Sequence, residues 1–252
     1  MTDIQFPSKD YVSPGFERIK LDPHFPNLII SDTSTCNWPY LRRTGQHNWY
    51  RDQRVPGIGF ANRDEVHILY NTALMFRGKD VLEIGCFLGW SACHIASAGV
   101  KLDVIDPILS DQGYFQSVTS SLQSAGVMDN VKLYSGKSPD AVTELVRQQN
   151  KRWSMVFIDG NHDFPGPVND AVVCERFCAD DAMILFHDLL SPHVAEGLQF
   201  FRYRGWKTRI FHTSQIMGVA WRGNVKPVHH IPDPAAHWEV PEHLKGWPEA
   251  QD

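Results

Sequence analysis

The sequence predicts an α/β protein built on one doubly wound, mostly parallel sheet. Short apolar segments with the length of buried strands alternate with longer segments of helical pattern between residues 62 and 203. A glycine-rich turn follows the first of these strands, and a carboxylate ends the second. Strands connected in this way run parallel, so their C-terminal ends share the edge of the sheet at which ligands bind.

Length and composition narrow the function. The 252 residues suffice for one such domain with extensions. The 24 basic and 29 acidic residues form no basic cluster, which argues against a nucleic-acid partner. No apolar run reaches membrane-spanning length, and residues 1–10 lack the regions of a signal peptide. Five cysteines without a CxxC pair complete the pattern of a soluble, cytoplasmic protein with no membrane partner.

Residues 1–61 form a predicted N-terminal extension that is dense in proline and aromatic residues. Disordered tails are poor in aromatic residues, so we expect this segment to pack onto something. A structural collar or a dimer contact is the favoured interpretation. The alternative is a lid over an organic substrate, with Trp49, Tyr50, Arg51 and Arg54 near its mouth.

Residues 62–223 form the predicted catalytic domain, which opens with a helix. Asn62 is the expected N-cap, Asp64 and Glu65 lie in the first turn, and the helix runs to about Phe76. Its apolar residues recur at helical spacing, which predicts one buried stripe.

The segment that follows has the pattern E-x-G-x-x-x-G. Residues 81–84 are the expected strand, Gly85 and Gly89 bracket a tight turn, and residues 91–98 begin a helix. This order lets a backbone without Cβ atoms approach the polar part of a nucleotide-like ligand, although a glycine turn can also be purely structural. The candidate ligand contacts are Glu83, Gly85, Cys86, Phe87, Gly89, Trp90 and Ser91.

A second strand, residues 100–106, ends in Asp106. A carboxylate at this strand tip can accept hydrogen bonds from both hydroxyls of a ribose. Strand, glycine loop, helix and terminal acid together resemble the cofactor half of the class I S-adenosylmethionine-dependent methyltransferases. The resemblance implies a Rossmann-like, seven-stranded sheet with S-adenosylmethionine as cofactor. In that family the glycine loop faces the methionyl part and the acid, here Asp106, holds the ribose.

The remaining elements complete the sheet. We expect helices at residues 113–125, 139–149, 167–178 and 193–203, strands at 131–134, 154–159 and 182–188, and a closing hairpin of 207–213 with 217–221. The resemblance implies that the loop after the third strand lies by the adenine, which makes Gly136, Lys137 and Ser138 candidates. A plain turn with Ser138 as a cap before Pro139 is the alternative.

Residues 224–252 read as a C-terminal surface arm. It is rich in proline, and its histidines show no regular ligand spacing. Titrating surface side chains are therefore expected at His229, His230, His237 and His243.

Two strand tips carry the polar residues that best suit catalysis. Asp159 ends the fourth strand and leads to His162, while His187 and Asp188 end the fifth. All four are candidate catalytic residues, Asp159 is also a candidate cofactor contact, and Asp159, His187 and Asp188 are candidate metal ligands. Carboxylates suit Mg²⁺, and an added imidazole moves the preference toward Mn²⁺, Fe²⁺ or Zn²⁺. A metal-free site with a histidine as general base is an equal alternative.

The D-G-x-H segment, the helix with Asp170 and the strand that ends in His-Asp resemble one branch of small-molecule methyltransferases, related to the catechol, caffeoyl-CoA and macrolide-sugar O-methyltransferases. Several relatives bind Mg²⁺ through an acid after the fourth strand and an acidic pair, or Asp-Asn, after the fifth. His187 stands where that pair would have its first member. The resemblance implies methyl transfer to a hydroxyl, or less favourably an amine, of a small metabolite, and a homo-oligomer.

Two other functions fit the same fold. One is a non-methylating enzyme, such as a hydroxylase, and the other is a non-catalytic module that binds S-adenosylmethionine. Polar residues concentrated at the strand tips disfavour the module, which would not need them.

Overall fold

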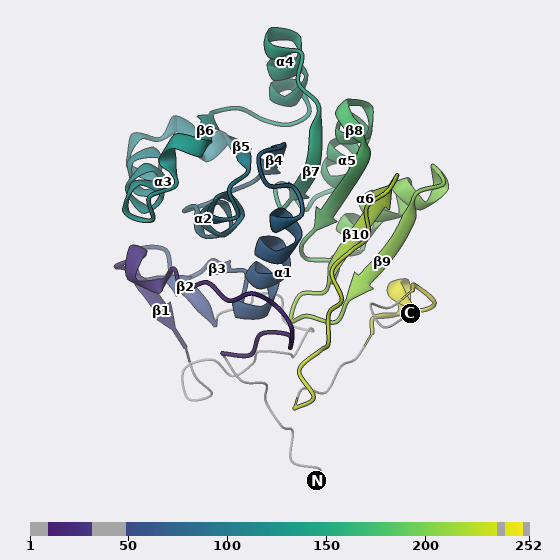
Figure 1. Cartoon of the computed structure of the whole chain (residues 1–252), viewed down its shortest axis with the longest axis horizontal. Helices are drawn as coiled ribbons and strands as arrows, with labels where there is room; N and C mark the ends of the chain where they lie inside the picture. Colours follow the sequence, from purple (N-terminus) through teal and green to yellow (C-terminus); the bar gives the residue numbers. More distant parts are fainter. Residues whose placement is uncertain (1–9, 32–48, 236–239, 249–252) are drawn as a thin grey trace.

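A computed structural model describes residues 10–31, 49–235 and 240–248 of the chain (Figure 1). A seven-stranded sheet with the order β6-β5-β4-β7-β8-β10-β9 forms its centre. Its strands are β4 (Asp80–Ile84), β5 (Lys101–Ile105), β6 (Val131–Tyr134), β7 (Trp153–Ile158), β8 (Cys178–Phe186), β9 (Lys207–Phe211) and β10 (Met217–Arg222). β4 to β8 pair in parallel, while β10 is antiparallel to both β8 and β9. The predicted doubly wound sheet and its closing hairpin are confirmed.

Six helices cover the two faces of this sheet. The first face carries α1 (Arg63–Leu74), α2 (Trp90–Ser97) and α3 (Gln112–Ser124), and the second carries α4 (Asp140–Gln149), α5 (Gly166–Phe177) and α6 (Pro192–Tyr203). Each face of the sheet has its own hydrophobic core, called here the first core (on the side of α1, α2 and α3) and the second core. Adjacent residues of β4 point to opposite faces, since Val81 belongs to the first core and Leu82 to the second. Because side chains alternate between the two faces of a strand and both faces are covered, the central strands carry buried apolar residues on both faces. Short 3₁₀ helices lie at Asp22–His24, Pro107–Ser110, Met128–Asn130 and Glu242–Leu244.

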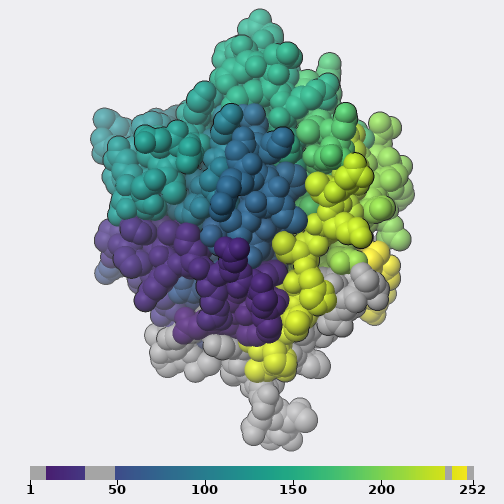
Figure 2. All heavy atoms as spheres, in the orientation of Figure 1, coloured from purple at the N-terminus to yellow at the C-terminus, as the bar shows by residue number. Residues whose placement is uncertain are grey.

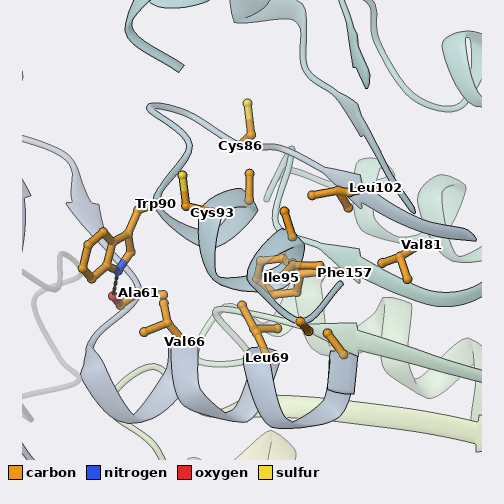
Figure 3. Packing of buried hydrophobic residues seen from close by; sticks show 14 of the residues in the cluster. Ala61, Val66, Leu69, Val81, Cys86, Trp90, Cys93, Ile95, Leu102 and Phe157 are labelled. Atoms are coloured by element: carbon orange, nitrogen blue, oxygen red, sulfur yellow. Dashed lines mark hydrogen bonds between the residues drawn. The ribbon is translucent and has the colours of Figure 1, made fainter. Parts of the chain in front are cut away.

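Helix α1 packs on α2 through the predicted apolar stripe. Val66 and Leu69 face Ile95 of α2 in the first core, and Phe157 of β7 lies in the same cluster (Figure 3). Asn62 accepts a hydrogen bond from the backbone N–H of Glu65, whose side chain accepts one from the N–H of Asn62. The predicted N-cap is therefore confirmed as a full capping box.

The described part of the N-terminal extension packs against α2. Its strands β1 (Leu28–Ile30), β2 (Tyr50–Asp52) and β3 (Gly59–Phe60) form a separate antiparallel sheet. Trp90 lies at the centre of this contact, because Tyr50 stacks on its ring and its indole N–H donates to the carbonyl of Ala61 at 2.9 Å (Figure 3). Trp49 and Tyr50 are buried, as a structural collar requires.

The C-terminal arm lies along the N-terminal segment (Figure 2). The N–H of Ile231 donates to the hydroxyl of Ser13, and His230 Nε2 lies 2.6 Å from a carboxylate oxygen of Asp64. His230 is fully buried, so the prediction of a titrating surface side chain is wrong at this position. Acid and imidazole come from positions far apart in the chain, which is why local pattern did not indicate the pair. His237 lies outside the described residues.

The remaining differences from prediction are small. Helix α5 ends at Phe177, and β8 begins directly at Cys178, which pairs with Trp153 of β7. Residues 180 and 181, which lie between the predicted helix (167–178) and the predicted strand (182–188), therefore belong to the strand. In the described ranges, no helix combines the length and the apolar character needed to cross a membrane.

Candidate active site

A cavity of about 710 Å³ opens at the C-terminal edge of the parallel strands. Every parallel strand of the sheet contributes to its wall, as the topology predicts. The lining residues are Ile58, Gly59, Ile84, Gly85, Phe87, Ile105, Asp106, Pro107, Ile108, Gly136, Lys137, Ser138, Asp159, Gly160, Asn161, His162, Asp170 and Asp188.

Gly85 brings the β4 and β7 tips into direct contact. Its φ is +87°, and a Cβ there would lie 2.2 Å from the carbonyl oxygen of Asp159. A side chain would therefore push the two strand tips apart. Gly89, which caps α2 with φ +85°, tolerates a Cβ little better, since Val118 of α3 would lie 3.2 Å away. Both glycines of the sequence pattern are required by this geometry.

Asp106 holds the glycine loop in place. One of its carboxylate oxygens accepts the N–H groups of Cys86 and Phe87, at 2.8 and 3.1 Å. The other accepts the N–H of Ile108 at 2.9 Å. A carboxylate has about four acceptor positions, so these bonds leave one for a ligand. The pairing of Asp106 with both hydroxyls of a ribose stays a prediction.

Glu83 is a buried acid beneath the same loop. The Ser91 hydroxyl donates to one of its oxygens at 2.5 Å, and its other oxygen has no hydrogen-bond partner among the described residues. Burial raises the pKa of Glu83 to about 8; the Ser91 hydrogen bond opposes this rise, and the charges of Asp159 and Asp106 add to it. The carboxyl is therefore largely protonated at neutral pH.

The predicted cofactor contacts divide between two spaces. Gly85, Phe87, Asp106, Gly136, Lys137, Ser138 and Asp159 line the main cavity. A neighbouring space of about 50 Å³, bounded by the N-terminal extension, is lined by Cys86, Trp90 and Ser91 as well. Glu83 and Gly89 line neither and act through the loop that they support.

Asp159, His162 and Asp188 form a cluster on the cavity wall, with one ligand atom from each lying within 4.8 Å of the others. His162 Nε2 is 3.5 Å from Asp159 Oδ1 and 3.4 Å from Asp188 Oδ2. Asp188 has a positive φ of 57°, a backbone conformation that is uncommon for residues other than glycine. The structure thus joins two predicted metal ligands, with His162 in the third position instead of His187.

His187 lies behind this cluster and is 1% exposed. Its Nδ1 is 3.1 Å from Asp188 Oδ2, and its Nε2 is 3.2 Å from Glu65 Oε2. Burial by itself lowers the pKa of His187, but the carboxylates of Asp188, Asp159 and Glu65 raise it well above the ordinary value. Burial raises the pKa of Asp159, yet the charge of His187 and the hydrogen bond to His162 outweigh burial and lower it. The buried imidazolium thus favours the ionised form of Asp159 on the cavity wall.

Glu65 is the site residue that the sequence did not indicate. It is fully buried, and its Oε1 accepts hydrogen bonds from the N–H of Gln215 and the hydroxyl of Ser214. In the sequence, Glu65 could be recognised only as a residue of the first helical turn, the position it occupies in the capping box. Its proximity to His187 comes from packing α1 against the end of β8, which no local pattern reports.

His162 is the most accessible member of the cluster, with 43% of its side chain exposed. The hydrogen bond with Asp159 raises the pKa of His162; burial opposes this rise, and the charge of Asp188 adds to it. His162 can therefore face an incoming substrate while it remains tied to the two carboxylates.

Comparisons with known proteins agree with this architecture. Residues 82–189 match a family model described as a methyltransferase domain. A search of curated proteins gave no match. Among solved structures, the O-methyltransferase TomG from Streptomyces achromogenes, in complex with S-adenosylmethionine, is 20% identical, covers 62% of this chain and 78% of its own, and has a TM-score of 0.52.

Two further solved structures have the same fold. A methyltransferase from Geobacter sulfurreducens is 21% identical over 67% of this chain and 83% of its own, with a TM-score of 0.55. An O-methyltransferase from Bacillus cereus, in complex with S-adenosylhomocysteine, is 13% identical over 61% of this chain and 79% of its own, with a TM-score of 0.51. At these identities the likeness is one of fold.

Proposed function

We propose that this protein, whose residues 82–189 form a class I S-adenosylmethionine-dependent methyltransferase domain, transfers a methyl group to a hydroxyl of a small-molecule metabolite. The observation that carries the proposal is the Asp159–His162–Asp188 cluster on the wall of the cavity that the glycine loop also lines. Such a cluster places acid, base and ligand groups beside the expected position of the methyl donor.

The cofactor part of the proposal is supported by the loop geometry. The backbone at Gly85 is open to the cavity, and Asp106 retains one acceptor position for a ribose hydroxyl. Gly136, Lys137 and Ser138 line the same cavity on the β6 side. S-adenosylmethionine supplies a methyl group on a sulfonium, which is a good leaving group.

The Asp159–His162–Asp188 cluster also fits a divalent cation. Neighbouring ligands of an octahedral ion with bonds of 2.0–2.1 Å lie about 3 Å apart, close to the 3.4 and 3.5 Å between His162 and the two carboxylates. Two carboxylates with one imidazole favour Mn²⁺ over Mg²⁺. A cation held there would lower the pKa of a substrate hydroxyl.

The side chains of the cluster can also serve the reaction directly. Methyl transfer is an in-line displacement, so holding the acceptor oxygen at near-attack distance from the methyl group is the main requirement. His162, at the exposed edge of the cluster, can accept the proton that the hydroxyl loses. His187, behind the cluster, contacts both carboxylates and favours the ionised form of Asp159, and Glu65 supports the positive charge of His187.

The acceptor atom, the oligomeric state and the alternative functions are separate predictions. An amine acceptor would need only deprotonation, which His162 could also provide. The homo-oligomer and the cytoplasmic location remain predictions, as do the hydroxylase-like and non-catalytic alternatives.

The proposal is tested by calorimetric titration with S-adenosylhomocysteine, before and after treatment with EDTA. We expect binding in both cases, because EDTA would remove only a cation and would leave the glycine loop and Asp106 in place. Transfer of labelled methyl groups from S-adenosylmethionine is then measured on hydroxylated and amino metabolites with Mg²⁺ or Mn²⁺. If S-adenosylhomocysteine produced neither heat nor thermal stabilisation, the proposal would be refuted. Methyl transfer that persists after EDTA treatment would exclude a catalytic cation and would support His162 as the general base.

A further inference from the structure

The loop that follows β8 carries Asp188 in a strained backbone conformation. Its φ of 57° lies in the left-handed region, which costs free energy for a residue with a side chain. Ile216, directly before β10, has a φ of 54°, and the branched Cβ of isoleucine makes this value less favourable still. The N–H of Leu189 donates to the carbonyl of Ile216 at 3.0 Å. The strained Ile216 is thus bonded to the residue that follows the strained Asp188.

Hydrogen bonds to the loop hold this conformation, since a strained backbone persists only where its surroundings fix it. The N–H of Leu190 donates to the carbonyl of Gln215 at 3.3 Å, so the turn between β9 and β10 holds two successive residues of the loop. A further bond comes from a side chain, because His243 Nε2 lies 2.8 Å from the carbonyl oxygen of Leu189. A carbonyl oxygen only accepts, so Nε2 is the donor. His243 therefore holds the carbonyl group of the residue next to Asp188.

The C-terminal arm places His243 and has anchors of its own. His243 lies in the last 3₁₀ helix, and Leu244 and Trp247 beside it are buried in the second core. The N–H of Ile210 in β9 donates to the carbonyl of Pro248 at 3.0 Å. These anchors use other side chains and backbone groups, while the His243 residue is exposed. We therefore expect the arm to stay docked when the His243 side chain is changed.

The position of this loop matters because Asp188 faces two histidines. Its Oδ2 lies 3.4 Å from His162 Nε2 and 3.1 Å from His187 Nδ1. Asp159 is held by the neighbouring strand, since its backbone N–H donates to the carbonyl of Ile84 in β4 at 2.8 Å. Small displacements of catalytic groups cost rate, so the geometry of the cluster depends on how well the loop after β8 is fixed.

We propose that His243 is a positioning residue for methyl transfer, because its hydrogen bond to the Leu189 carbonyl fixes the Asp188 carboxylate relative to His162. This inference rests on the proposed function. The β9–β10 turn and the C-terminal arm together clamp the loop after β8. Both lie outside residues 82–189, which match the methyltransferase domain, so this clamp is supplied by the C-terminal part of the chain.

The first test measures whether His243 holds the loop. Hydrogen exchange of the backbone amides in residues 187–191 is followed by mass spectrometry on the full chain. His243→Phe keeps a ring without a donor and should speed exchange in this segment roughly 3- to 10-fold, because one hydrogen bond is lost. Exchange in residues 85–91 should not change. His243→Gln, whose amide can donate, should restore protection. Equal exchange in His243→Phe and the unmodified protein would overturn the inference.

The second test measures whether this restraint serves the reaction. Calorimetry with S-adenosylhomocysteine should give one affinity for the unmodified protein and both His243 variants. With the acceptor found in the transfer screen, kcat of His243→Phe should fall roughly 3- to 10-fold at an unchanged KM for S-adenosylmethionine, and His243→Gln should recover. His229→Phe, at an exposed histidine of the same arm, is the control and should match the unmodified protein in both tests.

Two outcomes of the second test would overturn the inference alone. One is an unchanged kcat in His243→Phe despite faster exchange in residues 187–191. The other is a loss of S-adenosylhomocysteine affinity as large as the loss of kcat, which would indicate a general structural role. If S-adenosylhomocysteine did not bind the unmodified protein, the proposed function would be overturned and this inference with it.

Discussion

The tip of β5 and the tips of β7 and β8 satisfy their carboxylates in different ways. Asp106, after β5, is held by three backbone N–H groups, those of Cys86 and Phe87 in the glycine loop and that of Ile108 two residues further along the chain. Asp159 and Asp188 depend on two imidazoles, and the imidazole of His187 in turn faces Glu65 from α1. The Asp106 carboxylate is thus satisfied by backbone donors, and the carboxylates of the catalytic side by charged side chains, one of which depends on Glu65 from a distant helix.

This difference predicts which changes affect turnover and which affect binding. Charges in the cluster are coupled, so removing one alters the others. Hydrogen bonds at the β5 tip hold a loop, so their loss should weaken cofactor binding without directly altering the acid–histidine cluster.

The largest expected effect is that of Asp159→Ala. Its carboxylate lies within 3.6 Å of both His162 and His187, so its loss removes a ligand or orienting group from the cluster. We expect turnover to fall by at least about 100-fold while the affinity for S-adenosylhomocysteine changes little, as measured by steady-state kinetics and calorimetry. Asp163→Ala, in the same loop, serves as the control. Full activity of Asp159→Ala would contradict the catalytic assignment.

Asp106→Ala should weaken cofactor binding at the tip of β5. It removes the carboxylate that accepts three backbone N–H groups and would also face the ribose. We expect the affinity for S-adenosylhomocysteine to fall by about 1.5–3 kcal/mol, the range for a hydrogen bond that involves a charged group. Asp129→Ala, at an exposed acid after α3, is the matched control for calorimetry. Unchanged affinity would mean that the ribose lies elsewhere.

Glu65→Gln tests whether the catalytic side depends on α1. The substitution keeps the size of the side chain but removes the buried negative charge beside His187. Breaking a buried charge pair costs stability, and we expect a loss of about 1–3 kcal/mol in the free energy of unfolding, measured with urea. Glu196→Gln, at a half-exposed acid of α6, should unfold like the unmodified protein. Equal stability of the two variants would show that the Glu65 charge contributes nothing.

The last expected effect concerns Glu83 and depends on pH. Because burial raises its pKa to about 8 from an ordinary 4.5, the folded protein keeps a proton that the unfolded chain releases between these values. Stability contributed by this group therefore falls as the pH rises from about 5 to 8. Glu83→Gln cannot ionise, so its free energy of unfolding relative to the unmodified protein should increase over this range. Denaturation curves that shift in parallel at pH 5 and pH 8 would exclude this role.

Much of the fold followed from the sequence because its causes are local. Alternating apolar segments predicted the parallel sheet, and the pattern E-x-G-x-x-x-G predicted the turn that Gly85 and Gly89 make with positive φ. Asn62 was recognisable as a cap because its partner lies three residues away. The shared edge of parallel strands also explains why Asp159 and Asp188 were expected together.

The tertiary structure decided which histidine does what. His162 and His187 both follow strand tips in the sequence, yet His162 faces the cavity and His187 is buried against Glu65. Asp64 and Glu65 are neighbours in one helical turn, yet they meet His230 of the C-terminal arm and His187 of β8, respectively. The sequence by itself determined the sheet, the glycine loop and the acids at its edge, since hydrogen-bonding period and backbone sterics act over a few residues. Only packing determined the charge partners, because electrostatic pairing depends on distance in space, which the spacing of residues along the chain does not specify.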